Sequence, residues 1–194
     1  MTERLGDRAL RFARPHAAPA TILAAVKAWP GVIDVVIAAH DVAIYFGDEP
    51  SEDYEARIAE LAALPFEQAS GREHVIRVVY DGEDLPAVAE ATRLTVAEVI
   101  AAHAARTYDV ASIGFLPGFA YLDGLDERLE LPRRETPRVR VPAGALAIAG
   151  LQTAVYPFAS PGGWHLIGRA IDEPMFTPAR GARLAFGDRV RFVA

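Results

Sequence analysis

The sequence AIAGLQTAVYPFASPGGWHLIGR, residues 147–169, carries the strongest structural signal in this chain. Short apolar runs alternate in it with glycine and proline turns, a pattern typical of the short successive strands of a small β-barrel. Ten of the fifteen glycines fall within residues 111–194, where helical periodicity is absent. Strands are expected at 145–149, 153–156, 164–169 and 188–193. We therefore expect this region to be mainly β.

The first 80 residues show a different order, in which strand and helix patterns alternate. Strands are expected at 9–12, 32–38, 42–46 and 74–80, and helices at 20–29 and 51–61. This order is that of a ferredoxin-like α+β sandwich. Two short helices follow at 85–91 and 96–106, and Thr95 with Glu98 forms a capping box for the second. We expect a ferredoxin-like domain at 1–80, and two helices leading into a β-barrel at 81–194.

Composition limits the kinds of partner. The chain has 194 residues, 52% of them hydrophobic, and a formal net charge of -6. An acidic balance argues against nucleic acid or an anionic membrane as the main partner, because both attract a basic surface. No apolar run approaches the roughly 20 residues of a membrane span, and the N-terminus lacks the apolar segment of a signal peptide. We expect a cytoplasmic protein.

Several chemistries lack their residues in this chain. Cysteine is absent, which excludes disulfides and thiolate catalysis, and the five histidines do not show metal-site spacing. We therefore expect no metal site. Lysine occurs once, at Lys27, and no glycine-rich loop ends in GK[ST], the Walker-type phosphate motif. We expect no cofactor in this chain, and any ATP to be held by another chain.

Four stretches of the second region carry a family resemblance. They are IGFLPGFAYLDGLD (113–126), LPRRETPRVRVPAG (131–144), residues 147–169 and GDRVRF (187–192). Together they resemble the 5-oxoprolinase B-subunit family, also described as allophanate hydrolase subunit 1 and as sporulation kinase inhibitors. The resemblance covers nearly the whole chain and implies a ferredoxin-like domain followed by a cyclophilin-like β-barrel. Two departures are that Tyr80 is followed by DGEDLP instead of a longer glycine-rich link, and that His165 stands where glutamine is common.

Residues 159–170, ASPGGWHLIGRA, contain a candidate ligand site. Gly162 and Gly163 let the main chain pass close to a ligand or a partner chain, and Trp164 supplies a flat apolar wall. Neutral hydrogen-bonding groups come from Gln152, Thr153, Tyr156 and Ser160. Such a pocket suits a small, polar, uncharged amide such as a lactam ring. The alternative is a hairpin turn beside a core tryptophan.

Three further features have both a functional and a structural interpretation. Gly118 and Phe119 belong to a loop whose backbone amides face a ligand, or to a turn that fills the barrel. Arg140 pairs with a ligand carboxylate, or belongs to a solvated, proline-rich loop. His103 is a candidate catalytic base near a helix end, where the resemblance also places a histidine, or it is a packed core residue.

The resemblance implies a function that needs other chains. It implies a subunit of an ATP-dependent 5-oxoprolinase, which hydrolyses the lactam 5-oxoproline to glutamate. The implied partners are a carboxyltransferase-like chain, the C-subunit of such a complex, and a large lactam-utilisation chain. Two alternatives stay open from the sequence: a regulator that inhibits a sensor histidine kinase, and a component of a urea or allophanate pathway.

Overall fold

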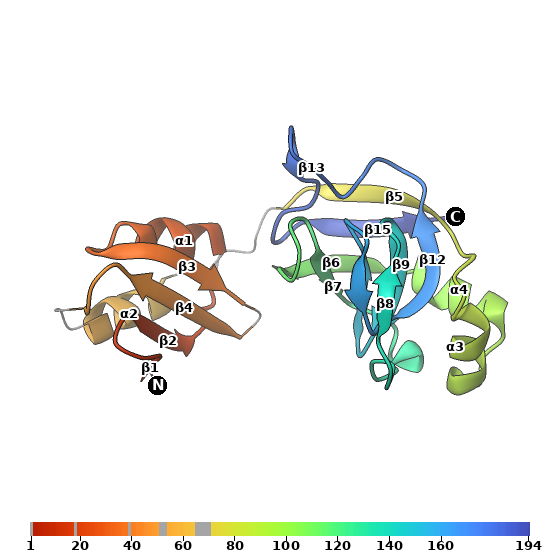
Figure 1. The fold of residues 1–194 in the computed structure, drawn as a ribbon, viewed down its shortest axis with the longest axis horizontal. Helices are drawn as coiled ribbons and strands as arrows, with labels where there is room; N and C mark the ends of the chain where they lie inside the picture. The colour runs from red at the N-terminus through yellow and green to blue at the C-terminus, as the bar shows by residue number, and fades with distance from the viewer. Residues whose placement is uncertain (1, 18, 39, 51–53, 65–70) are drawn as a thin grey trace. The chain divides into compact units, whose positions relative to one another are not determined.

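The computed structural model describes residues 2–17, 19–38, 40–50, 54–64 and 71–194. The chain divides into two compact units, Met1–Ala69 and Ser70–Ala194, which are described separately below (Figure 1). None of the helices that the structure describes is long and apolar enough to cross a membrane.

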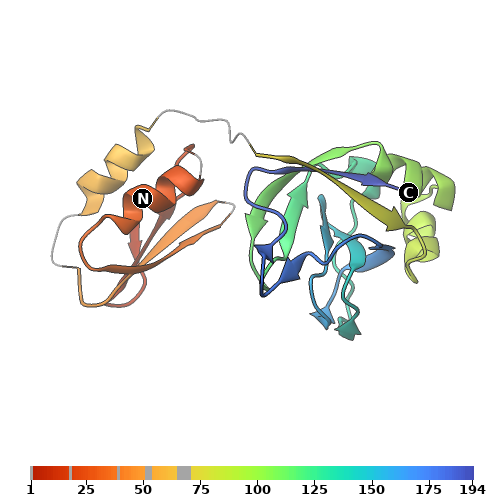
Figure 2. The same ribbon diagram turned by 90° about the horizontal axis from the view of Figure 1, so that it is seen from above.

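The described part of the first unit is an antiparallel sheet with two helices on one face (Figure 2). Its elements are β1 (Thr2–Arg4), β2 (Ala9–Ala13), α1 (Pro19–Lys27), β3 (Val32–Ile37), β4 (Asp41–Phe46) and α2 (Tyr54–Ala62). The strands lie in the order β1-β2-β4-β3. Alternate residues of β2 and β4, among them Phe12 and Ile44, pack against Ile22 of α1 and Leu61 of α2. This packing follows from the alternation of side chains along a strand.

The ferredoxin-like sandwich expected for residues 1–80 is not confirmed. The strand expected to complete it is β5 (Glu73–Val79), and β5 pairs in parallel with the C-terminal strand of the second unit. Its buried residues Ile76 and Val78 point into the core of the second unit, which explains the pairing. The strand pattern at 74–80 was therefore correct, but its assignment to the first domain was wrong.

The second unit contains a closed barrel, as the turn-rich sequence predicts. Within residues 71–194 the barrel strands are β5, β6 (Thr107–Ile113), β7 (Ala120–Asp123), β9 (Ala145–Ala149), β10 (Gln152–Val155), β12 (His165–Ala170) and β15 (Arg189–Val193). They close in the order β10-β7-β6-β15-β5-β12-β9. Neighbours are antiparallel except β5 and β15. Strands β6 and β7 were not predicted, because their residues were interpreted as parts of motifs.

Two helices pack side by side against the barrel (Figure 1). They are α3 (Leu85–Thr92) and α4 (Val96–Ala104), and the short 3-10 turn η1 (Glu127–Leu129) lies beside them. The predicted capping box of α4 is confirmed: the Thr95 hydroxyl accepts from the Glu98 N–H at 3.2 Å, and Glu98 accepts from the Thr95 N–H at 2.7 Å.

A two-stranded ribbon lies outside the barrel and creates a second, smaller core. The ribbon is β8 (Arg138–Val141) paired with β11 (Ser160–Gly162), and a separate hairpin joins β13 (Phe176–Thr177) to β14 (Gly181–Ala182). The smaller core contains Val141 of the ribbon with Phe119, Tyr156 and Trp164. The candidate site lies at this core.

Candidate functional site

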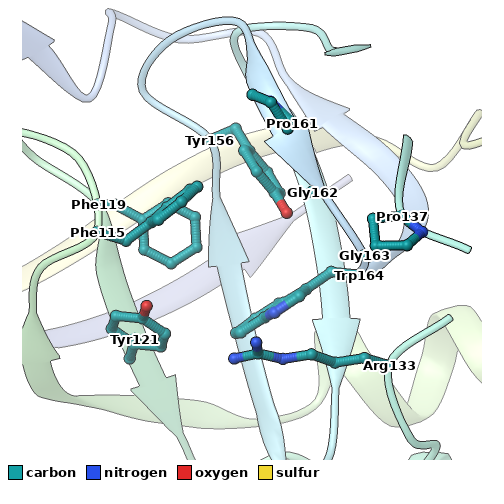
Figure 3. A pocket seen from close by; sticks show the side chains of 10 residues that line it. All are labelled: Phe115, Phe119, Tyr121, Arg133, Pro137, Tyr156, Pro161, Gly162, Gly163 and Trp164. Carbon is teal, nitrogen blue, oxygen red and sulfur yellow. The ribbon is translucent and has the colours of Figure 1, made fainter. Parts of the chain in front are cut away.

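A pocket of about 210 Å³ opens beside the smaller core (Figure 3). Its lining is aromatic, proline or glycine apart from one cation. The lining residues are Phe115, Phe119, Tyr121, Arg133, Pro137, Tyr156, Pro161, Gly162, Gly163 and Trp164. Segments far apart in the sequence therefore meet here: the loop after β6, the stretch around β8, and the stretch around β11.

The aromatic wall of the pocket is rigid because its rings pack edge to face. The Phe119 ring centroid lies 4.9 Å from that of Tyr121, 5.2 Å from that of Tyr156 and 5.8 Å from that of Trp164. Phe119, Tyr156 and Trp164 are all buried. Such contacts add to the stability gained by burial and hold each ring in one orientation. The wall therefore exists before any ligand arrives.

Of the two glycines predicted to allow a close approach, Gly162 has such an approach, and its neighbour is part of the protein itself. A methyl group at Gly162 would overlap the hydroxyl of Tyr156. One at Gly163 would face the carbonyl of Arg134 and the ring of Pro137 at 3.7 Å. The missing side chain of Gly162 lets Tyr156 come close, whereas a methyl group at Gly163 would make only ordinary van der Waals contacts.

The Tyr156 hydroxyl is a neutral hydrogen-bonding group at this site. Burial raises its pKa above the usual value, although the charge of Arg133 and the backbone N–H of Trp164 act in the opposite direction. The hydroxyl therefore keeps its proton at neutral pH. A protonated phenol can donate a hydrogen bond to a carbonyl oxygen in the pocket.

The cation of the pocket is Arg133, and Arg140 lies elsewhere. Arg140 is exposed on β8, does not line the pocket, and makes no ion pair with a residue that the structure describes. Arg133 does line the pocket, where its guanidinium extends along Trp164 in Figure 3. The arginine of PRRETPRVR that lines the pocket is thus Arg133 and not the predicted Arg140, because the path of this segment depends on contacts with residues distant in the sequence.

Phe115 stands at the pocket in an unusual conformation. Its φ is 69° and its exposure is 59%, although it is a large apolar residue. Bulky residues seldom adopt positive φ, and such strain persists where the surrounding structure imposes it, often at functional sites. Its ring packs edge to face on Phe119 at 5.4 Å. Phe115 is thus the accessible aromatic group of the GFLPGF loop, whereas Phe119 is buried.

Four other predicted ligand residues lie outside the lining, and one of them, Thr153, is hydrogen-bonded to His103 in the interior. Gly118 has φ 79° and packs closely against Phe176, so it shapes the loop that carries Phe119. The Gln152 amide donates to Asp123 Oδ1 at 2.7 Å. Ser160 on β11 is buried, and its Oγ makes no hydrogen bond with a described residue.

His103, the predicted catalytic base, is in the interior of the second unit. It is fully buried and does not line the pocket. Thr153 Oγ1 donates to the Ala147 carbonyl at 3.0 Å, so it accepts from His103 Nε2–H at 2.9 Å. The Nδ1 atom then accepts from the Tyr80 hydroxyl at 2.8 Å. Both ring nitrogens are occupied, and burial lowers the pKa of His103 to about 3.

A buried carboxylate that was not predicted binds the PRRETPRVR stretch, which also carries Arg133. Asp84, in the DGEDLP segment before α3, accepts from Arg134 at 2.8 Å, from Arg138 at 2.7 Å and from the Leu166 N–H at 2.7 Å. Burial by itself raises the pKa of Asp84, but these hydrogen bonds and the two guanidinium charges outweigh burial and lower it. Asp84 is therefore ionised at neutral pH.

No group of three or more histidine, cysteine or carboxylate side chains gathers in a metal-binding arrangement among the described residues. The chemistry available at the pocket is therefore that of its own groups: aromatic faces, backbone, phenol hydroxyls and one guanidinium. These groups can bind and orient a small ligand, but they do not include a nucleophile paired with a base.

Comparison with known proteins places this geometry in a family. A family model described as "Carboxyltransferase domain, subdomain C and D" matches residues 8–185. The 5-oxoprolinase B-subunit of Bacillus subtilis (strain 168) is 35% identical, with 98% of this chain and 91% of the relative covered. The 5-oxoprolinase B-subunit of Haemophilus influenzae is 38% identical, with 84% of this chain and 79% of the relative covered.

Solved structures show the same fold within longer chains. The crystal structure of TTHA0988 matches with a TM-score of 0.81 and 38% identity over 96% of this chain, which spans 39% of that chain's length. The Kluyveromyces lactis urea amidolyase matches with a TM-score of 0.75 over 99% of this chain and 14% of its own. Its 17% identity shows a shared fold alone. The family model and the two bacterial relatives establish that this chain belongs to the 5-oxoprolinase B-subunit family.

Proposed function

We propose that this chain is a subunit of an ATP-dependent 5-oxoprolinase complex, and that its pocket binds the lactam substrate, 5-oxoproline. The observation that supports the proposal is the rigid aromatic pocket with one guanidinium, Arg133, and neutral phenol hydroxyls around it. The proposed reaction is taken from the names of the relatives, which are B-subunits of 5-oxoprolinase.

The substrate has three features that this pocket can recognise. Its five-membered ring would lie against the face of Trp164, its carboxylate would pair with Arg133, and its lactam oxygen would accept from the Tyr156 hydroxyl. Arginine suits a carboxylate because its planar fork donates two parallel hydrogen bonds. Since Tyr156 stays neutral, it does not repel the anionic ligand. The pocket of about 210 Å³ is large enough for a ligand of this size.

Hydrolysis of the lactam would need a group that this chain does not provide. An amide is a poor electrophile, and transfer of the γ-phosphoryl group of ATP to its oxygen makes the carbon open to attack. Water then adds, the C–N bond breaks, and the ring nitrogen takes a proton. A second water releases the phosphate, which leaves glutamate, ADP and phosphate.

The sequence has one lysine, Lys27, and no Walker-type phosphate motif. In this proposal a partner chain therefore holds ATP, and the residues of this chain bind and orient the lactam. The partners would be the carboxyltransferase-like C-subunit and a large lactam-utilisation chain.

The proposal is tested by the dependence of ATP hydrolysis on 5-oxoproline concentration, measured for the complex reconstituted with its partner chains. A charge-assisted pair contributes about 1.5–3 kcal/mol, so Arg133→Ala should raise the KM for 5-oxoproline about ten- to a hundredfold. Arg133→Lys should recover part of the loss, because an ammonium lacks the planar fork. Arg140→Ala is the matched control, since Arg140 is an exposed arginine of the same PRRETPRVR stretch.

The outcome separates the two arginines. An unchanged KM for Arg133→Ala in an assembled complex would refute substrate binding at this pocket. A large effect of Arg140→Ala alone would instead place the substrate carboxylate at Arg140, which is exposed on β8.

A further inference from the structure

The segment that carries Arg133 crosses the pocket as a separate arm, residues 131–141. At one end of the arm, the Leu131 carbonyl accepts from the Gly150 N–H at 2.7 Å. At the other end, β8 pairs with β11. Between them, the Arg134 N–H donates to the Gly163 carbonyl at 2.8 Å, and His165 Nε2 donates to the Pro132 carbonyl at 2.8 Å. The two ends of the arm are also held by apolar packing, because Val141 is buried in the smaller core and Leu131 packs against the larger one. The middle part of the arm carries Arg134 and Arg138.

Asp84 joins this arm to the barrel. Its Oδ1 accepts from Arg134 Nη1 and from Arg138 Nη2, while its Oδ2 accepts from the Leu166 N–H on β12. The Asp84 N–H also donates to the Leu166 carbonyl at 3.0 Å. One carboxylate thus connects two arginines of the arm to one residue of a barrel strand.

Gly82 makes this close approach possible. A methyl group at Gly82 would overlap the backbone of Leu166, Ile167 and Gly168. The main chain of DGEDLP therefore lies directly on β12, which places the Asp84 side chain, exposed by only 6%, under the arm.

We propose that Asp84 is a positioning residue: by binding Arg134 and Arg138 it holds the arm over the barrel, so that Arg133 faces the pocket and meets the carboxylate of the ligand. This inference rests on the proposed function, because it assigns to Asp84 the orientation of the group that would bind the substrate. Asp84 itself does not line the pocket.

Charge balance is the physical reason why loss of the Asp84 carboxylate would displace the arm. Arg138 has a second carboxylate partner, Glu83 at 2.6 Å, but Glu83 is exposed by 63%. Arg134 pairs with Asp84 and with no other carboxylate that the structure describes. Arg134 Nε and Arg138 Nη1 are already buried without a partner among the described residues. Without the Asp84 charge, the guanidinium groups of Arg134 and Arg138 would be poorly hydrated and would lack this carboxylate. Movement of the arm into water would hydrate them.

Limited trypsin digestion followed by mass spectrometry measures the position of the arm without any assay of activity. In Asp84→Asn, the rate of cleavage after Arg133 and Arg134 should rise about tenfold, because an amide holds a guanidinium less firmly than a carboxylate does. Asp81→Asn is the matched control, since Asp81 lies in the same DGEDLP segment but pairs with Arg169. If Asp84→Asn fails to fold, Arg138→Met replaces it. This variant removes one ion pair between the arm and Asp84 and leaves Asp84 paired with Arg134.

Kinetics of the reconstituted complex test the positioning role. Asp84→Asn should raise the KM for 5-oxoproline about tenfold with little change in kcat, and the double variant Asp84→Asn/Arg133→Ala should be no worse than Arg133→Ala. Unchanged cleavage of the arm in both Asp84→Asn and Arg138→Met would overturn the inference. Faster cleavage with an unchanged KM, or fully additive effects in the double variant, would overturn it as well.

The same kinetic experiment tests the proposed function separately, through the variant Arg133→Ala. If Arg133→Ala leaves KM unchanged, the substrate does not bind to Arg133 and the proposed function fails. In that case Asp84 has no substrate contact to position, and this inference fails too, whereas the digestion still reports whether Asp84 holds the arm.

Discussion

The interior of the second unit should lose stability in mild acid because of one histidine. His103 is fully buried, and the groups packed against it are neutral: Tyr80 after β5, Tyr108 on β6, Thr153 on β10 and Phe192 on β15. No carboxylate of residues 71–194 forms a hydrogen bond with its ring, so no anion balances a positive charge there. Burial therefore lowers the pKa of His103 to about 3.

The sign of the effect follows from which state binds the proton. In the unfolded chain this histidine has a pKa of about 6.5, so below that pH the unfolded state takes up a proton that the folded state does not. The contribution is fully present above pH 6.5 or so and is lost as pH falls toward the folded value, at about 1.4 kcal/mol per pH unit. Between pH 7 and pH 5 the free energy of unfolding should fall by about 2 kcal/mol from this group.

Urea unfolding at several pH values, followed by the fluorescence of Trp164, measures this loss. The chain has two tryptophans, so Trp29→Phe leaves Trp164 as the sole reporter, and Trp164 lies in the second unit. The variant His103→Gln lacks the titrating ring and should show a shallower pH dependence from pH 7 to pH 5, although it starts from a lower stability. If the wild-type and His103→Gln slopes coincide over that range, His103 titrates as an exposed histidine does and the argument from burial is refuted.

Two further predictions concern the pocket. Gly162→Ala should destabilise the second unit by about 1–3 kcal/mol, because its methyl group meets the Tyr156 hydroxyl, and Tyr156→Phe in the same chain should recover part of the loss in urea unfolding. Phe115→Gly should leave stability unchanged or raise it by up to about 1 kcal/mol, since glycine adopts positive φ without strain, while it raises the KM for 5-oxoproline. Equal losses of stability in Gly162→Ala with and without Tyr156→Phe, or an unchanged KM for Phe115→Gly, would contradict these expectations.

Local patterns in the sequence predicted most of the elements but not the partner of every strand. The capping box at Thr95 and the strands at 145–149 and 153–156 depend on nearby residues, and they were recovered to within a residue or so. The strand β5 was recognised as well, yet its partner β15 begins 116 residues later by the register Arg189↔Glu73. Alternation of apolar residues shows that a strand has a buried face, but it does not show which core that face meets.

The sequence predicted those residues of the candidate site whose chemical type alone indicated a role in the pocket. Gly162, Gly163 and Trp164 were chosen because glycines beside a tryptophan indicate a close approach, and Tyr156 was chosen as a neutral hydrogen-bonding group. The structure places all four in the pocket lining. His103 was chosen on the position of a histidine near a helix end. The sequence could not show that both of its ring nitrogens are occupied, because their partners lie on other elements.

The arginines of PRRETPRVR show why the rest of the site could not be predicted. Four guanidiniums within eight positions have the same chemistry, and what separates them is which ones the distant Asp84 binds. Arg134 and Arg138 bind Asp84, whereas Arg133 lines the pocket and Arg140 is exposed on β8. A signal was present in the DGEDLP segment, where a glycine two residues before an aspartate allows the carboxylate to lie under another strand. That signal can be interpreted only when the position of the β12 backbone is known. Gly82 is required by its contact with Ile167 and not by the conformation of its own turn. Which arginine lines the pocket therefore depends on the packing between DGEDLP, β12 and the arm, and mutation of Asp84 tests that packing more directly than mutation of any one arginine.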